Sequence, residues 1–266
     1  MSATLVPTTL DLSIIIPAYN EEQRITPTLE RVHQFLSAQT RSLVTGGADV
    51  APLRYEIVVV DDGSADGTAA LVERLGQRLP GLRCVRSIPN RGKGSAVRIG
   101  MLAARGAVRL MCDADGSMPA EEMPKLLARI AAGDTDVAIG SRYAGGALVG
   151  VRQPLYRRLW SRLCNRIVQR TLVPGVRDTQ CGFKAFTASA ATDLFGRARI
   201  DGWAFDLEVL ALASRRGLAI AEVAVSWTDD RRSRVNPLKD MWKVIREAVT
   251  IRRNLSRGVY GQLSAA

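Results

Sequence analysis

The sequence predicts an α/β fold in which a mostly parallel central sheet is flanked by helices. Short runs rich in Val and Ile alternate with segments of helical periodicity along the first half of the chain, which is the pattern of a parallel sheet. Acidic and polar residues follow several of these runs directly, as expected where strands end at the ligand-binding edge of an open sheet. The 266 residues, 47% of them hydrophobic, suffice for one sizeable core, and we expect one large domain.

Five strands are expected in the first half, and a helix is expected after each of the first four. The strands are Leu12 to Ile16 (ended by Pro17), Glu56 to Val60, Leu82 to Arg86, Val108 to Cys112 and Asp136 to Gly140. Thr26-Pro27 is expected to open the first helix, with Thr26 as its cap and Pro27 at its first position. The later helices are expected from Thr68 towards Arg78, from 90–95 to about Arg105, and from Pro119. Residues 40–53, with Gly46-Gly47 and Pro52, predict an exposed loop.

The composition restricts the class of protein. The net charge of +11 and the pI of about 10.1 indicate an anionic partner, such as phosphates, nucleic acid or an anionic membrane. No apolar run approaches the roughly 20 residues of a membrane span, and the N-terminus lacks the layout of a signal peptide, so we expect a cytosolic protein. The four cysteines form no CxxC pair, and the only histidine, His33, lies in a helix-like stretch, which leaves little room for histidine-based catalysis.

Two segments have the pattern of amphipathic helices at a membrane surface. Residues 155–172 carry an apolar face, and four arginines spaced four apart beside it: Arg158, Arg162, Arg166 and Arg170. No acidic residue lies between Asp136 and Asp178, so a membrane interface is favoured over a solvated basic face. A second such helix is expected from Pro237, although Asp240 and Glu247 weaken its case.

The strand that ends at Cys112 is followed by the sequence Asp113-Ala114-Asp115-Gly116-Ser117. In an extended chain the side chains of Asp113 and Asp115 point the same way. Two converging carboxylates suit a hard divalent cation, Mg²⁺ or Mn²⁺. The alternative is a solvated turn, because Asp, Gly and Ser favour turns.

Other strand ends carry the residue types that a nucleotide needs. Asp61 and Asp62 can accept hydrogen bonds from a base or a ribose, and the segment 91–94 (Arg-Gly-Lys-Gly) places cations and exposed amides at a helix N-terminus, where a phosphate is stabilised. The segment is not a P-loop, and a GxGxxG is missing after the first strand, which counts against a nicotinamide dehydrogenase. Together with the carboxylate pair, these loops predict a site for a nucleotide diphosphate and a divalent metal.

The chain resembles the inverting GT-A glycosyltransferases of family 2. The segments that carry the resemblance are IIIPAYNEE, VVVDDGSADGT, NRGKGSAVRIG, DADGS, GSRY, DTQCGFKAF and WTDDRRSR, from about Leu12 to the helix after Pro237. Within the family, the chain is most similar to the branch that glycosylates polyprenyl or dolichyl phosphates, and DTQCGFK followed by WT and a basic SR pair resembles the dolichyl-phosphate β-glucosyltransferases. The resemblance implies a single GT-A domain over 1–266, with a nucleotide-sugar half at 12–140, an acceptor half at 141–235, and a C-terminal amphipathic helix and tail at 236–266.

The resemblance also assigns roles to individual residues. Donor contacts are implied for Pro17, Ala18, Tyr19, Glu21, Asp62, Lys93, Asp113, Ala114 and Gln180. Asp115 is implied as the ligand of Mg²⁺ or Mn²⁺, with Asp113 and Ser117 beside it; Ser117 stands where mannosyl relatives have a glutamine. Acceptor contacts are implied for Arg142, Arg158, Arg231, Ser233 and Arg234. Asp113, Asp115 and Arg142 would form the catalytic centre.

The implied reaction is transfer of a hexose, glucose from UDP-glucose, to a polyprenyl phosphate with inversion to a β-linkage. A phosphate nucleophile is already anionic at neutral pH, so a general base is not essential. We expect Asp206 and Glu208 to be structural, and the protein to bind the inner face of the plasma membrane. The alternatives are mannose transfer from GDP-mannose, a soluble acceptor or, remotely, a basic nucleic-acid-binding protein, although stacking and zinc motifs for nucleic acid are missing.

Overall fold

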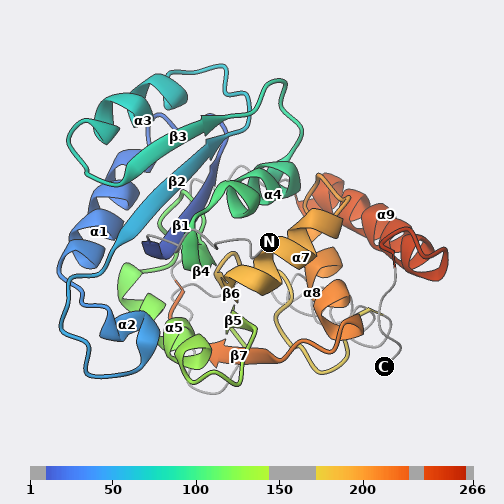
Figure 1. Ribbon diagram of the computed structural model, residues 1–266. Coiled ribbons are helices and arrows are strands. Elements are labelled where there is room, and N and C mark those ends of the chain that lie inside the picture. The colour runs from blue at the N-terminus through green and yellow to red at the C-terminus, as the bar shows by residue number, and fades with distance from the viewer. Residues whose placement is uncertain (1–9, 144–171, 228–236, 262–266) are drawn as a thin grey trace, which may run out of the picture.

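The computed structural model describes residues 10–143, 172–227 and 237–261. Its centre is a seven-stranded sheet in the order β3-β2-β1-β4-β6-β5-β7 (Figure 1). The strands are β1 (Leu10–Ala18), β2 (Tyr55–Asp61), β3 (Leu82–Arg86), β4 (Gly106–Met111), β5 (Val137–Ser141), β6 (Lys184–Thr187) and β7 (Ile220–Ala224). β6 is antiparallel to β4 and β5, whereas the other pairings among the described strands are parallel. The prediction of a mostly parallel sheet is confirmed.

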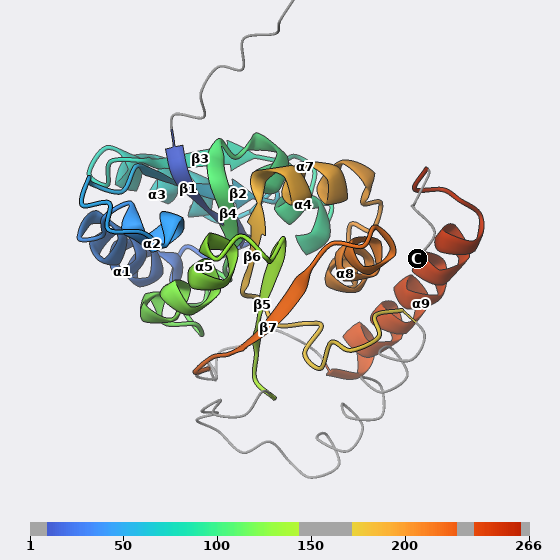
Figure 2. The ribbon, with the colours of Figure 1, turned by 60° about the horizontal axis from the view of Figure 1, so that its bottom comes forward.

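Helices cover both faces of this sheet. They are α1 (Ile25–Ser37), α2 (Ser42–Thr45), α3 (Thr68–Gly76), α4 (Lys93–Ala103), the 3-10 turn η1 (Ala120–Glu122), α5 (Met123–Ala131), α7 (Ala188–Arg197), α8 (Phe205–Arg215) and α9 (Pro237–Ser256). Residues of α1, α3 and α5 join one core cluster, and residues of α4, α7, α8 and α9 join another. In Figure 2, α1 and α5 lie on one side of the sheet and α8 and α9 on the other.

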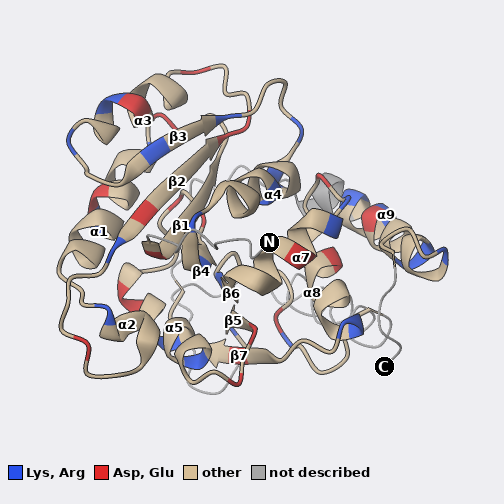
Figure 3. Ribbon diagram, viewed as in Figure 1, with Lys and Arg blue, Asp and Glu red and all other residues tan. Residues whose placement is uncertain are grey.

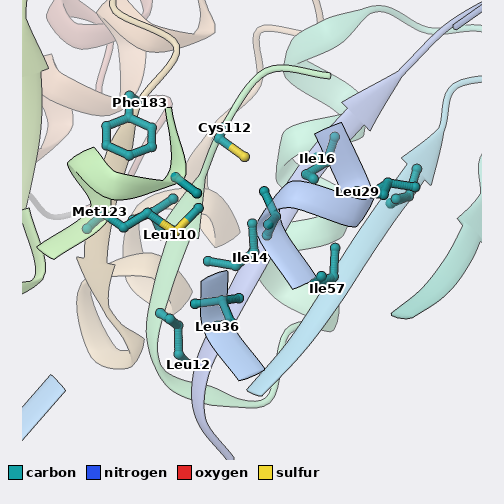
Figure 4. Packing of buried hydrophobic residues seen from close by; sticks show 14 of the residues in the cluster. Leu12, Ile14, Ile16, Leu29, Leu36, Ile57, Leu110, Cys112, Met123 and Phe183 are labelled. Carbon is teal, nitrogen blue, oxygen red and sulfur yellow. The ribbon is translucent and has the colours of Figure 1, made fainter. Parts of the chain in front are cut away.

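The two cores are separated by the alternation of side chains along the central strand β1. Ile14 and Ile16 pack with Leu29 of α1 and Ile57 of β2 (Figure 4), whereas Ile15 faces the cluster on the opposite side. All of these side chains are fully buried, and each contributes about 1.5–3 kcal/mol by leaving water. The sheet is therefore a rigid base for the loops at its edge.

The carboxyl ends of six parallel strands meet at one edge of the sheet. The loops at this edge follow β1, β2, β3, β4 and β5, and they contain the segments 17–21, 61–67, 90–93, 113–117 and 142–143. Because β6 runs the opposite way, its first residue, Lys184, lies at the same edge. The segment that leads into β6 (residues 178–183) is thereby brought to the predicted site. β6 and β7 lie in the second half of the chain but complete the same sheet.

Several predicted boundaries are wrong, for local reasons. β1 continues through Pro17 to Ala18 beside β2. Its pairing with β4 ends at Ile15, so no residue of β4 needs the N–H that Pro17 lacks. α1 begins at Ile25 rather than at the predicted Thr26 cap, since the N–H groups of Arg24 and Ile25 both donate to the carbonyl of Glu21. The predicted loop 40–53 contains the short helix α2, and Thr40 and Pro52 form an isolated bridge across it.

Candidate active site

The centre of the site is an ion pair between the end of β4 and the start of α4. Nζ of Lys93 lies 2.6 Å from Oδ1 of Asp113, and both side chains are more than half buried. Burial lowers the pKa of Lys93, but the charges of Asp113, Asp206 and Asp115 more than offset this and hold its pKa above its usual value. Lys93 is therefore a fixed positive charge at a helix N-terminus, a combination that can bind a phosphate.

The loop after β4 turns more sharply than predicted. Ala114 and Asp115 lie in a turn rather than in an extended chain, and Gly116 supports it with a φ of 69°. The Thr28 hydroxyl donates to the Ala114 carbonyl (2.9 Å), and the Ser117 N–H donates to Oδ1 of Asp115 (2.9 Å). The turn alternative is thus partly correct. The charges of both carboxylates nevertheless raise the pKa of Lys93.

The segment before β6 encloses Asp113 from the other side. A side chain at Gly182 would collide with the carboxylate of Asp113, so only glycine allows this approach. Behind it, the buried ammonium of Lys184 lies 2.7 Å from Oδ1 of Asp206 and donates to the Cys181 carbonyl. Burial raises the pKa of Asp206, and the charges of Lys184 and Lys93 only partly oppose this. Lys184 and Asp206 form an internal pair that supports the site.

Glu208, the other acidic residue early in α8, also makes internal contacts. Its carboxylate accepts hydrogen bonds from the N–H groups of Arg199 and Ile200 and from the Tyr260 hydroxyl (2.7 Å). The contacts of Asp206 and Glu208 fit the structural roles that we expected for them.

A second charged pair lies at the end of β5. Nε and Nη2 of Arg142 each donate to the carboxylate of Asp178 at 2.8 Å, and the guanidinium carbon lies 5.6 Å from the ring centroid of Trp227. Burial raises the pKa of Asp178, but the hydrogen bonds and charge of Arg142 outweigh it and lower the pKa below its usual value. Glu222 of β7 accepts the N–H of Asp178 (2.8 Å), so the pair is held from both sides.

The two aspartates after β2 have different surroundings. The carboxylate of Asp62 accepts the backbone N–H groups of Arg91 (3.0 Å) and Gly92 (2.7 Å), and so shapes the loop that precedes Lys93. Both carboxylate oxygens of Asp61 are buried and have no hydrogen-bond partner within the described residues. Of the two, Asp61 is the one whose carboxylate makes no hydrogen bond in the described residues, whereas the resemblance implied the donor contact for Asp62.

The loop after β1 is tied to the loop after β2. The N–H groups of Asn20 and Glu21 donate to the hydroxyls of Ser64 and Thr68, and the Asn20 side chain accepts the N–H of Ala65. Pro17 and Ala18 end β1 at this place, and the side chain of Tyr19 is 48% exposed. The carboxylate of Glu21 pairs with Arg24 (2.5 Å).

Of the remaining predicted site residues, only Gln180 lies within the part of the chain that the structure describes. Gln180 is exposed and lies within the segment 178–183, which encloses Asp113. Arg158, Arg231, Ser233 and Arg234 lie outside the described residues, as does the arginine-rich helix predicted over 155–172 apart from its last residue. Their contributions to the site stay predictions.

Two tryptophans make contacts at this edge that the sequence did not predict, although Trp227 belongs to the segment WTDDRRSR that carries the resemblance. Trp203 lies over Lys93, whose Nζ is 5.3 Å from the centroid of its ring, and Trp227 lies beside Arg142. Each contact joins segments more than 80 residues apart, and no spacing in the sequence marks it. An isolated tryptophan within a polar stretch, such as DGWAFD around Trp203, is the one available signal.

The carboxylate oxygens at the turn after β4 could hold a divalent ion that takes most of its ligands from a substrate. No group of three or more His, Cys, Asp or Glu that could hold a metal occurs in the part of the chain that the structure describes. Oδ1 of Asp113 is paired with Lys93, and Oδ1 of Asp115 accepts the Ser117 N–H, so these two contacts do not use Oδ2 of either carboxylate. Mg²⁺ is commonly held by one or two carboxylates together with substrate phosphates and water.

Comparisons with known proteins show the family of the chain. The profile of glycosyl transferase family 2 matches residues 13–195. The chain is 36% identical to dolichyl-phosphate beta-glucosyltransferase of Dictyostelium discoideum over 94% of this chain and 76% of that protein. It is 38% identical to the Drosophila melanogaster enzyme of the same name, over 86% and 70% of the two chains, and 32% identical to the human one, over 95% and 78%.

Solved structures share the fold. Mannosyl-3-phosphoglycerate synthase from Rubrobacter xylanophilus matches with a TM-score of 0.68 at 20% identity, covering 96% of this chain and 77% of that one. Glucosyl-3-phosphoglycerate synthase from Mycobacterium tuberculosis, in complex with Mn²⁺, UDP-glucose and phosphoglyceric acid, matches with a TM-score of 0.64 at 20% identity, covering 94% and 80%. Both the family profile and the relatives span most of the described sheet and its edge. The chain is a glycosyltransferase and belongs to glycosyltransferase family 2.

Proposed function

We propose that this protein transfers glucose from UDP-glucose to a polyprenyl phosphate and forms a β-linked lipid-phosphate sugar. The observation that carries the proposal is the similarity, over nearly the whole chain, to several enzymes named dolichyl-phosphate beta-glucosyltransferase. The site supports it, because the two fixed cations Lys93 and Arg142 lie at one sheet edge that also bears carboxylates. Such a site can hold two anionic substrates together.

The proposed reaction needs no general base. A polyprenyl phosphate oxygen attacks C1 of glucose from the side opposite the diphosphate; the new C1–O bond forms, the bond to UDP breaks, and the α-linked donor gives a β-linked product. The one histidine, His33, contacts the Tyr55 hydroxyl through Nδ1 (2.9 Å) and is not needed for this chemistry. Lys93 offsets the repulsion between the two anions and stabilises the charge that develops on the leaving diphosphate. Arg142 would bind the acceptor phosphate.

A divalent ion, Mg²⁺ or Mn²⁺, would be held by Asp115. When bound, it would neutralise the diphosphate and make it a better leaving group. Asp113 and Ser117 would support it, Asp113 by keeping Lys93 in place and Ser117 by orienting the Asp115 carboxylate through its N–H. The nucleoside would be recognised beside β1 and β2, where the buried carboxylate of Asp61 can accept from a base N–H.

The acceptor lipid places the enzyme at a membrane surface, and α9 has the character needed to bind there. Val244, Ala248, Ile251 and Leu255 pack on the core, whereas Trp242 and Val249 are each 64% exposed. The exposed cations on this helix are Lys243, Arg246, Arg252 and Arg253 (Figure 3). An outward face with an aromatic residue and several cations suits an anionic lipid interface.

Of the two acidic residues that weakened the case for α9, Glu247 is turned inward, and the side chain of Asp240 lies outside those that the structure describes. The carboxylate of Glu247 accepts the N–H of Ala204 at 2.8 Å and lies against Gly202. It therefore does not oppose the cations of the outward face. In the described part of the chain, no helix is long and apolar enough to cross a bilayer. We propose peripheral binding at the cytoplasmic face of the plasma membrane, where nucleotide sugars are available.

The test of the proposed donor is a panel of radiolabelled UDP- and GDP-sugars incubated with the protein, a polyprenyl phosphate and Mg²⁺. Label from UDP-glucose should pass into the organic phase, and the product should resist α-glucosidase. Label from GDP-mannose instead would favour the alternative donor and contradict the assignment of glucose.

A further inference from the structure

Trp203 has an unusual position for a large aromatic residue. Its side chain is 39% exposed, and it lies in the segment 198–204 that connects α7 to α8. Nζ of Lys93 is 5.3 Å from the centroid of its ring, and the same Nζ is 2.6 Å from Asp113. The ring therefore borders the ion pair at the centre of the site.

The segment that carries Trp203 is held by contacts on both sides of the ring. On the N-terminal side, the carboxylate of Glu208 accepts the N–H groups of Arg199 and Ile200 at 2.9–3.0 Å. On the C-terminal side, the carboxylate of Glu247 accepts the N–H of Ala204 at 2.8 Å. These contacts preorganise the ring before any ligand arrives, which lowers the entropic cost of binding.

The same segment packs closely on the loop before α4. The carboxylate of Asp201 pairs with Arg91 (3.3 Å) and with Arg98. A Cβ at Gly92, whose φ is 112°, would lie 2.6 Å from the carbonyl oxygen of Asp201, so this approach requires glycine there. Since Lys93 follows Gly92, the tryptophan and the ammonium are fixed relative to each other.

From this geometry we infer that Trp203 binds the hexose of the donor, a role that rests on the proposed function. The C–H groups on one face of a pyranose are apolar and weakly positive, and they stack on the negative face of an indole. Because Nζ of Lys93 lies over the ring, the pyranose would stack on the part of the indole that the ammonium does not cover, with hydroxyl groups of its edge directed towards Lys93. An aromatic wall beside a few converging polar groups is the usual makeup of a small-ligand pocket.

The sheet order favours the hexose over the nucleobase as the group on Trp203. Asp113, which the ring borders through Lys93, follows β4, whereas the base-binding carboxylate proposed above, Asp61, follows β2. β1 lies between these two strands. The ring is thus nearer to the strand end where the diphosphate and sugar would lie.

The test is calorimetric titration of wild type, Trp203→Ala and Trp203→Phe with UDP-glucose and with UDP, each in the presence of Mg²⁺. We expect Trp203→Ala to bind UDP-glucose about tenfold more weakly, with UDP affinity unchanged, and Trp203→Phe to recover part of the loss. Leu102→Ala is the matched control, because it removes an exposed apolar side chain (46%) from the far end of α4. Near-ultraviolet circular dichroism checks that each variant is folded.

The outcomes separate this inference from the proposed function. If wild type binds GDP-mannose rather than UDP-glucose, the proposed donor is wrong, and the same comparison is made with GDP-mannose and GDP. If Trp203→Ala binds the nucleotide sugar as tightly as wild type, the inference is overturned. An equal loss of affinity for the nucleotide sugar and the free nucleotide also overturns it, because the ring then contacts the nucleotide.

Discussion

Arg142 and Asp178 form a two-point pair in which Nε and Nη2 of the guanidinium donate to the two oxygens of one carboxylate, each at 2.8 Å. The backbone N–H of Arg142 donates to the same carboxylate at 2.9 Å. The pair joins the end of β5 to the segment that leads into β6. The contacts with Asp178 use Nε and Nη2 and so orient the guanidinium without using Nη1, which we propose binds the acceptor phosphate.

The substitution Arg142→Lys should raise the KM for polyprenyl phosphate about tenfold, because an ammonium cannot donate to Asp178 in a fork and bind a phosphate at the same time. The KM for the nucleotide sugar should change less than about twofold, and steady-state kinetics with each substrate varied measures both. Arg83→Lys is the control, since Arg83 pairs with Glu56 (2.8 Å) at the opposite end of the strands. A change confined to the donor KM would contradict the assignment of Arg142 to the acceptor.

The substitution Asp115→Asn should lower kcat by about 100-fold or more, because it removes the proposed anionic ligand of the metal on the leaving diphosphate. EDTA should abolish transfer by the wild type, and excess Mn²⁺ should restore it. Asp134→Asn, at an exposed aspartate before β5, is the matched control. Full activity of the wild type in EDTA would exclude the metal role.

The double substitution Trp242→Ala with Arg246→Glu should reduce binding to vesicles of anionic lipid about tenfold or more, because it removes an apolar anchor and reverses a charge on the outward face of α9. Flotation in a density gradient measures the bound fraction, and calorimetry should show unchanged binding of soluble UDP-glucose. The control Arg129→Glu reverses an exposed charge on α5, on the other side of the sheet. Equal flotation of both variants would remove α9 from the proposed membrane contact.

The stability of the protein should depend on pH through Glu56. Burial raises the pKa of this carboxyl, but hydrogen bonds from Arg83, Arg105 and Ser13 outweigh it, and the pKa lies below its ordinary value of 4.5. A pKa that is lower in the folded state stabilises the fold at pH above the ordinary value, and this contribution is lost as the pH falls through the lowered pKa.

The difference in free energy of unfolding between wild type and Glu56→Gln should therefore narrow as the pH falls from about 6 to 3. Urea denaturation at several pH values measures it. Asp134→Asn serves as an exposed control whose difference from wild type should stay small throughout. A difference for Glu56→Gln that is constant with pH would show that its ionisation does not contribute.

The sequence predicted those strands and helices whose own pattern of apolar and polar side chains determines where they form. β3 has the predicted bounds, and the helix expected from Thr68 is present as α3 (Thr68–Gly76). The extension of β1 through Pro17 could not be predicted, because it depends on which neighbouring strand ends first. The antiparallel strand β6 has only four residues and too short a pattern to be recognised.

The sequence predicted which residues lie at the site but not which residues they contact. The carboxylates after β2 and β4, Lys93 and Arg142 all lie at the expected edge. Their partners could not be inferred, since Lys93 with Trp203 and Arg142 with Asp178 are distant in sequence and meet only through the folded sheet. The turn at Asp115 was given only as the alternative, because the Thr28 hydroxyl that donates to the Ala114 carbonyl belongs to α1.

The most direct measurement of the central claim is a competition between acceptors for the same donor. The protein is incubated with radiolabelled UDP-glucose, Mg²⁺ and equal amounts of polyprenyl phosphate and 3-phosphoglycerate, and the organic and aqueous products are counted. We predict that the label enters the organic phase only when polyprenyl phosphate is present and that Lys93→Ala prevents this transfer. Label that remains aqueous, whether in a phosphoglycerate product or in free glucose, would contradict the account.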